Sequence, residues 1–143
     1  MMFGPVAAQQ AEEWVQITTG HHNMAFGRNS AQQSERSDIL LILSRPGEAE
    51  RSYVAERIHI NADCGAGMIA YGDFTITSIP GGEVTRTGTY AGTERGVMFR
   101  PPRGSRTQLV SWICDGMSSS DYGPLSYSDA VDVAIFWLSR QSQ

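Results

Sequence analysis

The chain has 143 residues, of which 41% are hydrophobic and 18% are charged, and its formal net charge is −4. This length and composition favour one globular domain with its own core. The negative net charge argues against a nucleic-acid-binding protein, although all eleven basic residues are arginine. No apolar run reaches the roughly 18 residues that a membrane helix needs. We therefore expect no nucleic-acid partner and at most a peripheral association with a membrane.

The N-terminal segment differs in composition from the rest of the chain. Residues 1–11 read MMFGPVAAQQA and are followed by two acidic residues. Val6 and Ala8 fit the small-residue positions before a signal-peptide cleavage site, and Pro5 fits the helix-breaking segment. We interpret residues 1–11 as the remnant of a longer signal peptide or, alternatively, as a disordered cytosolic tail. Residues 12–143 are then the folded domain.

Alternation of apolar and polar residues predicts that most of the domain is β-sheet. The clearest strand places Ile58, Ile60, Ala62 and Cys64 on one face and polar residues on the other. Residues 39–43 are apolar on both faces, which favours a central strand covered from both sides. Further strands are predicted at residues 14–18, 24–26, 69–79, 83–90, 97–99 and 106–115.

The C-terminal segment changes to a helical period. From residue 127 to residue 140, the apolar residues recur at the spacing of one helix face. Ser126 and Asp129 form a start that resembles a capping box. Many strands followed by one helix indicate an α+β fold. We expect an antiparallel sheet of about six strands with one C-terminal α-helix packed on it.

The two cysteines, Cys64 and Cys114, both lie at strand positions whose side chains are expected on the apolar face of the predicted strand. Two inward thiols of one small core can form a disulfide, which would stabilise the fold by roughly 4 kcal/mol on the chain-entropy model. This prediction depends on export, because disulfides persist in oxidising compartments. The alternative is a pair of buried free cysteines that act as small apolar residues.

Several of these features resemble the surface-adhesin protein E family of small bacterial envelope proteins. They are Trp14 at the start of the first strand, an Ile-x-Ile-x-x-Asp-Cys pattern at residues 58–64, and a Pro-Pro-Arg-Gly-Ser segment at residues 101–105 that leads to Cys114. The resemblance implies an antiparallel sheet whose concave side holds a C-terminal helix through a disulfide, and some members bind host matrix proteins. Residues 24–34 lack the family's usual aromatic-Asp stretch, so no functional residue is transferred.

Histidines supply the most metal-like pattern of the chain. His21, His22 and His59 offer three imidazoles, and Asp63 shares a strand face with His59. Three ligands and an open position would suit catalytic zinc, and a small metal-dependent hydrolase is therefore one alternative function. The other interpretation is exposed loop histidines, because adjacent residues of an extended chain point in opposite directions. We expect no cofactor and assign no catalytic residue.

Two further surfaces are candidates for contact with a partner. Arg95, Arg100, Arg103 and Arg106 cluster around two prolines and either grip a carboxylate, a phosphate or an acidic partner or form a solvated sheet edge. On the C-terminal helix, Phe136 and Val133 are expected outside the apolar stripe that packs on the sheet, and Trp137 is expected at the edge of this stripe. These residues either dock onto another protein or cover a loop.

These observations predict a non-enzymatic, periplasmic or extracellular bacterial protein. It would act as a protein-binding module, an adhesin-like surface protein or an accessory subunit of an envelope complex. Besides the hydrolase, a second alternative to this envelope protein is a cytosolic partner or inhibitor protein with reduced cysteines.

Overall fold

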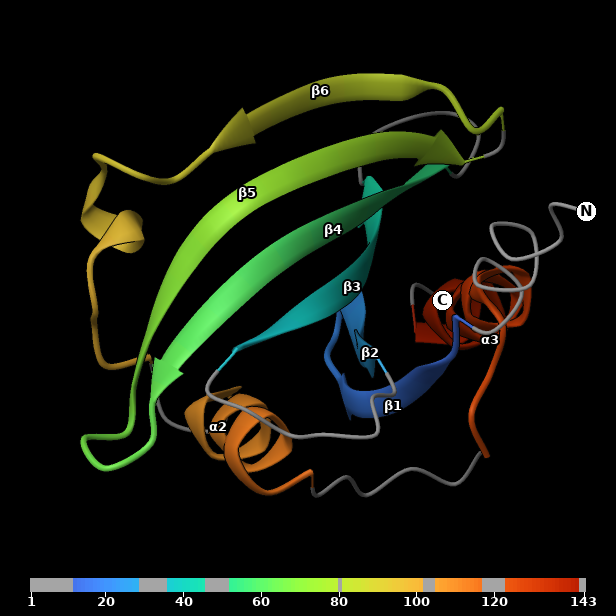
Figure 1. Ribbon diagram of the computed structural model, residues 1–143. Coiled ribbons are helices and arrows are strands. Elements are labelled where there is room, and N and C mark those ends of the chain that lie inside the picture. The colour runs from blue at the N-terminus through green and yellow to red at the C-terminus, as the bar shows by residue number, and fades with distance from the viewer. Residues whose placement is uncertain are drawn as a thin grey trace, which may run out of the picture.

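A curved β-sheet is the main architectural element of the protein (Figure 1). The computed structural model describes residues 12–28, 36–45, 52–79, 81–101, 105–116 and 123–141, so the proposed signal-peptide remnant lies outside the described residues. The sheet has six antiparallel strands, in agreement with the predicted sheet of about six, and they pair in chain order. They are β1 (Trp14–Thr19), β2 (Asn23–Arg28), β3 (Arg36–Arg45), β4 (Ser52–Asp63), β5 (Met68–Ile79) and β6 (Val84–Thr89).

Within the described residues, two α-helices pack on this sheet, one more than the sequence predicted. The expected C-terminal helix is α3 (Tyr127–Gln141), and its N-terminus is capped by the Ser126 hydroxyl, which accepts a 3.1 Å hydrogen bond from the Asp129 backbone N–H. The second helix, α2 (Ser105–Asp115), occupies the segment predicted as the last strand. A one-turn 3-10 helix, η1 (Glu94–Gly96), lies between β6 and α2. None of the described helices is long and apolar enough to span a bilayer.

The prediction of a strand at residues 106–115 is wrong because two adjacent residues of this segment are both buried in the same core cluster, on one face of the sheet. Trp112 and Ile113 are 3% and 0% exposed, and Leu109 packs against the same core cluster. A strand directs neighbouring side chains to opposite faces, whereas a helix brings residues i, i+3 and i+4 to one face. A short apolar run fits both periods, so contact with the sheet selects the helix.

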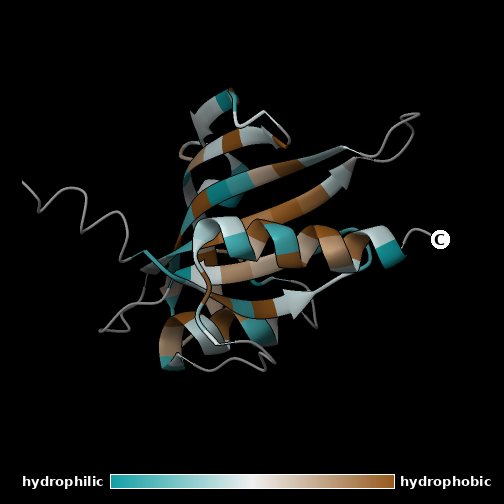
Figure 2. Ribbon diagram, turned by 90° about the vertical axis from the view of Figure 1, so that its right-hand side faces the viewer, coloured by the Kyte–Doolittle hydropathy of each residue, from teal (hydrophilic) through white to brown (hydrophobic). Residues whose placement is uncertain are grey.

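The two helices lie on opposite faces of the sheet. On β3, Leu40 belongs to the core cluster that contains α3, and its neighbour Ile39 belongs to the cluster that contains α2. We call these the α3 face and the α2 face. Helix α3 lies in front of the sheet in the view of Figure 2, and it fully buries Ala130, Ala134 and Leu138. β3 is therefore covered from both sides, as its sequence predicted.

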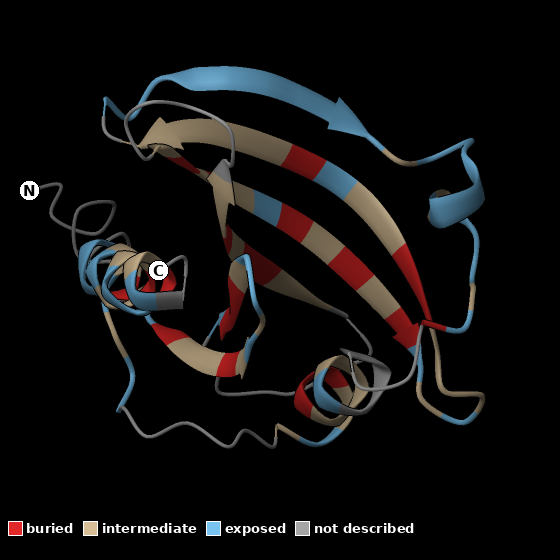
Figure 3. Ribbon diagram, turned by 180° about the vertical axis from the view of Figure 1, so that it is seen from behind, coloured by how far each residue is buried: buried red, intermediate tan, exposed pale blue. Residues whose placement is uncertain are grey.

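Burial decreases towards one edge of the sheet (Figure 3). Along β4, Ile58, Ile60 and Ala62 are buried and alternate with more exposed residues, as the sequence predicted. Every residue of β6 is exposed. The predicted strand at residues 97–99 reduces to one bridge, in which Phe99 and Ile69 exchange backbone hydrogen bonds of 2.8 and 2.9 Å. This bridge holds the connection from η1 to α2 against β5.

A disulfide joins α2 to the sheet. Cys64 directly follows β4, Cys114 lies in the last turn of α2, and their Cα atoms are 5.9 Å apart. The predicted pairing is confirmed, but the expectation that Cys114 lies on a strand is wrong. The disulfide tethers α2, whereas the C-terminal helix α3 packs on the other face. This arrangement differs from the one that the resemblance implies, in which the C-terminal helix is tethered.

Candidate functional site

A cavity of about 220 Å³ lies on the α2 face, between the sheet, η1 and α2. We call it the α2-face cavity. Its apolar lining consists of Ala25, Ile39, Leu41, Leu43, Ile58, Ile60 and Leu109. Its polar lining consists of Thr18, Asn23, Glu56, Tyr71, Tyr90 and Arg95. A mostly apolar cavity with a few converging polar groups is the usual form of a ligand site.

Glu56 enters the cavity because of its position on β4. It has the same parity as Ile58 and Ile60, and alternation along the strand therefore turns its carboxylate to the α2 face. The sequence analysis did not single out Glu56. The alternation that identified the buried face of β4 would have found it, because a carboxylate at an apolar position is itself a signal.

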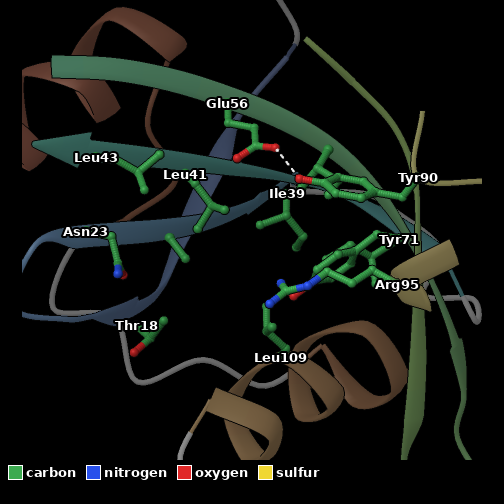
Figure 4. A pocket seen from close by; sticks show the side chains of 13 residues that line it. Thr18, Asn23, Ile39, Leu41, Leu43, Glu56, Tyr71, Tyr90, Arg95 and Leu109 are labelled. Carbon is green, nitrogen blue, oxygen red and sulfur yellow. Dashed lines mark hydrogen bonds between the residues drawn. The ribbon is translucent and has the colours of Figure 1, made fainter. Parts of the chain in front are cut away.

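The Glu56 carboxylate accepts a hydrogen bond of 3.4 Å from the Tyr90 hydroxyl (Figure 4). Burial raises the pKa of Glu56 above its ordinary value, against the opposing effects of this hydrogen bond and of the charges on Arg86 and Arg95. A carboxylate with a raised pKa in a cavity is a frequent property of functional sites, although structural networks show it too.

Aromatic rings form the wall of the cavity beside Glu56. The ring centroids of Tyr71 and Tyr90 are 5.5 Å apart, and the Arg95 guanidinium carbon lies 5.8 Å from the centroid of Tyr71. Figure 4 shows the Arg95 side chain reaching into the cavity beside Tyr71. Burial raises the pKa of both tyrosines, so their hydroxyls remain protonated donors at neutral pH.

The structure separates the four arginines that the sequence grouped. Arg95 lines the α2-face cavity. Arg100 lies instead beside the turn after β4, with its Nη1 atom 3.8 Å from the position of a Cβ on Gly67. Arg103 and the side chain of Arg106 lie outside the described parts of the structure. Among the described residues, Arg86 of β6 also acts on this region through its charge on Glu56.

The three candidate metal-ligating histidines are not brought together. The register places Asn23, the neighbour of His22, opposite Leu43, whereas His59 is opposite Asp38 near the other end of β3. His59 Nδ1 lies 3.0 Å from Asp38 Oδ1, and the Asp63 carboxylate accepts a hydrogen bond from the backbone N–H of Ala66. Within the described ranges, no three His, Cys, Asp or Glu side chains form a possible metal site.

The outer surface of α3 carries the predicted aromatic residues. Phe136 is 49% exposed, and its ring contacts Trp137 edge-to-face at a centroid distance of 5.8 Å. The Arg140 guanidinium carbon lies 4.1 Å from the centroid of Phe136. Val133 is partly buried against the core cluster of the α3 face, so it belongs to that packing rather than to the exposed aromatic surface.

No protein-family model, curated protein or solved structure matches this chain.

Proposed function

We propose that this chain is a non-enzymatic binding protein, exported to the bacterial envelope, that holds a small, mainly apolar ligand in the α2-face cavity. One observation carries the proposal. An aliphatic floor from β2, β3, β4 and α2 meets a small group of polar side chains from β4, β5, η1 and the end of β6 in one cavity. Such sites orient a ligand with the polar groups and bind it with the apolar surface.

The disulfide supports export. Bonded cysteines persist in the periplasm and outside the cell, whereas cytosolic thiols are kept reduced. The two bonded cysteines, Cys64 and Cys114, lie in the two segments on which the resemblance to the surface-adhesin protein E family of envelope proteins is based. The cytosolic alternative needs both thiols to be free. Thiol titration of the protein from its native cells, denatured without reductant, distinguishes the two: two free thiols per chain would contradict export.

The ligand site can be tested with an uncharged fluorescent probe, N-phenyl-1-naphthylamine, which brightens in apolar surroundings. We expect saturable binding at one site per chain. Replacing Leu41, which lines the cavity, by tryptophan fills the space and should abolish the signal. The matched control is Val84→Trp, because Val84 is 60% exposed on β6 and lies outside the cavity. Equal dye binding by both variants would contradict the proposed site.

A second candidate function is protein binding through α3. It is favoured by the exposed Phe136 ring, which Arg140 and Trp137 both contact, since aromatic residues and arginine are enriched in interfaces. Chemical cross-linking in the native organism tests it. A specific cross-linked partner that is lost in a Phe136→Asp variant with unchanged folding would support this surface as an interface, and cross-links that persist in the variant would contradict it.

A further inference from the structure

We infer that the ligand of the α2-face cavity is a small aliphatic monocarboxylate, held by Arg95 at its carboxylate and by the aliphatic floor at its chain. This inference rests on the proposed function and adds the chemical class of the ligand. It follows from the charges around the cavity, the state of Arg95 and the size of the space.

The balance of charge around the cavity favours an anion. The ionisable groups that act on Glu56 or face it across the cavity are Arg86 of β6, Arg95 of η1, Tyr71 of β5 and Tyr90 after β6. With both tyrosines neutral, the charged lining is one carboxylate, Glu56, and one guanidinium, Arg95. The charge of Arg86 also acts on Glu56 from β6, so these three groups sum to a net positive charge even when Glu56 is ionised. A bound cation would meet repulsion from both guanidinium groups.

Two aromatic rings at or near the cavity, Tyr71 and Phe74, already carry an arginine over one face. Arg95 lies over Tyr71, and the Arg86 guanidinium carbon lies 5.5 Å from the centroid of Phe74. An ammonium ligand that used these same ring faces for cation–π contacts would have to displace one of these arginines. The aromatic wall therefore supports an anionic ligand, because it holds Arg95 in place for a counter-ion.

Arg95 has the donors that such a ligand needs. In the described ranges, no carboxylate lies within ion-pair distance of Arg95; the ion pairs found involve Arg28, Arg57 and His59. A guanidinium presents its N–H groups in a planar fork that matches the two oxygens of a carboxylate. The neutral hydroxyl of Tyr71 is a further donor at the same wall. A doubly charged phosphate fits less well, since Glu56 repels each added negative charge.

The aliphatic floor and the volume of the cavity determine the size of the apolar part of the ligand. Leu41, Leu43 and Leu109 belong to the lining of the cavity and are only partly buried, so each leaves apolar surface that a ligand can cover. The volume of 220 Å³ has room for about seven groups the size of a water molecule or a methylene. A saturated chain of about eight carbons matches this space.

Three probes with the same chain and different head groups test the inference: octanoate, n-octanol and octylammonium. Their binding to the intact protein is measured by calorimetry at neutral pH. Octanoate should bind at least about tenfold more tightly than octanol, from charge-assisted hydrogen bonds, and octylammonium should bind more weakly than octanol. Equal or tighter binding of octanol or octylammonium would overturn the carboxylate assignment while leaving the cavity as a binding site. No binding by any probe would overturn both proposals.

Two variants and a control locate the head group. Arg95→Gln should lower octanoate affinity about tenfold and leave octanol affinity unchanged, because only the carboxylate uses the guanidinium. Glu56→Gln should raise octanoate affinity several-fold, because it removes a negative charge from the cavity. Arg100→Gln is the matched control, since Arg100 is exposed and does not line the cavity. Unchanged octanoate binding in Arg95→Gln, or an equal loss in Arg100→Gln, would contradict the role of Arg95.

Discussion

Gly27 of β2 lies directly against the indole ring of Trp112 on α2, so closely that a Cβ on this glycine would overlap the ring. Gly27 is on the α2 face of the sheet, where Trp112 and Ile113 form the packing surface of the helix. The absence of a side chain at Gly27 thus sets how closely α2 approaches the sheet, and α2 contributes Leu109 to the α2-face cavity.

Gly27→Ala should destabilise the protein by about 1–3 kcal/mol, because a methyl group inserted into a filled core displaces its neighbours. Urea unfolding followed by tryptophan fluorescence measures the change. The matched control is Gly123→Ala, since a Cβ at Gly123 meets no atom within 4 Å. If the two alanine variants are equally stable, the contact between Gly27 and Trp112 does not set the helix position.

Replacing both Cys64 and Cys114 by serine should lower the free energy of unfolding by about 2–4 kcal/mol, because the disulfide closes a loop across a sequence separation of 50 residues. Urea unfolding of the double variant and of the oxidised wild type measures the difference. Because the disulfide tethers α2, the double variant should also bind the naphthylamine dye more weakly at low urea. Undiminished dye binding would mean that packing against the sheet holds α2 without the bond.

Glu56→Gln should stabilise the protein at neutral pH. Burial raises the pKa of Glu56 above its ordinary value of 4.5, so ionisation is less favourable in the folded state than in the unfolded state. This cost is present when the pH exceeds the raised pKa and disappears as the pH falls below 4.5, where the carboxyl is neutral in both states. Urea midpoints should therefore be higher for the variant at pH 7 and converge with wild type in acid. A lower midpoint for the variant at pH 7 would show that Arg86 and Arg95 outweigh burial.

Phe136→Asp should change the free energy of unfolding by no more than about 0.5 kcal/mol, because an exposed residue loses little packing. Leu138→Ala, two residues further along α3, should cost about 2–5 kcal/mol, since Leu138 is fully buried. Thermal unfolding of both variants makes the comparison. A large loss in Phe136→Asp would place this ring in the core and remove it as a candidate interface.

The sequence was sufficient for features that depend on local periodicity. Alternation along β4 identified its buried face, the helical period and the Ser126 cap located α3, and the apolar run in β3 marked a strand covered on both sides. It also predicted the pairing of Cys64 with Cys114, although it assigned the second cysteine to the wrong kind of element. These inferences succeed because a side chain's face follows from its position within one strand or helix.

Only the tertiary structure decided the identity of α2 and the composition of the cavity. The segment containing Trp112 fits a strand or a helix by period, and burial of both Trp112 and Ile113 against the sheet settles the choice. Glu56, Tyr71, Tyr90 and Arg95 come from separate elements, and no local pattern brings them together. Sequence grouped Arg95 with Arg100 because they are neighbours in the chain. The fold instead places Arg95 opposite Glu56, because strand pairing and sheet curvature bring residues together irrespective of their separation in sequence.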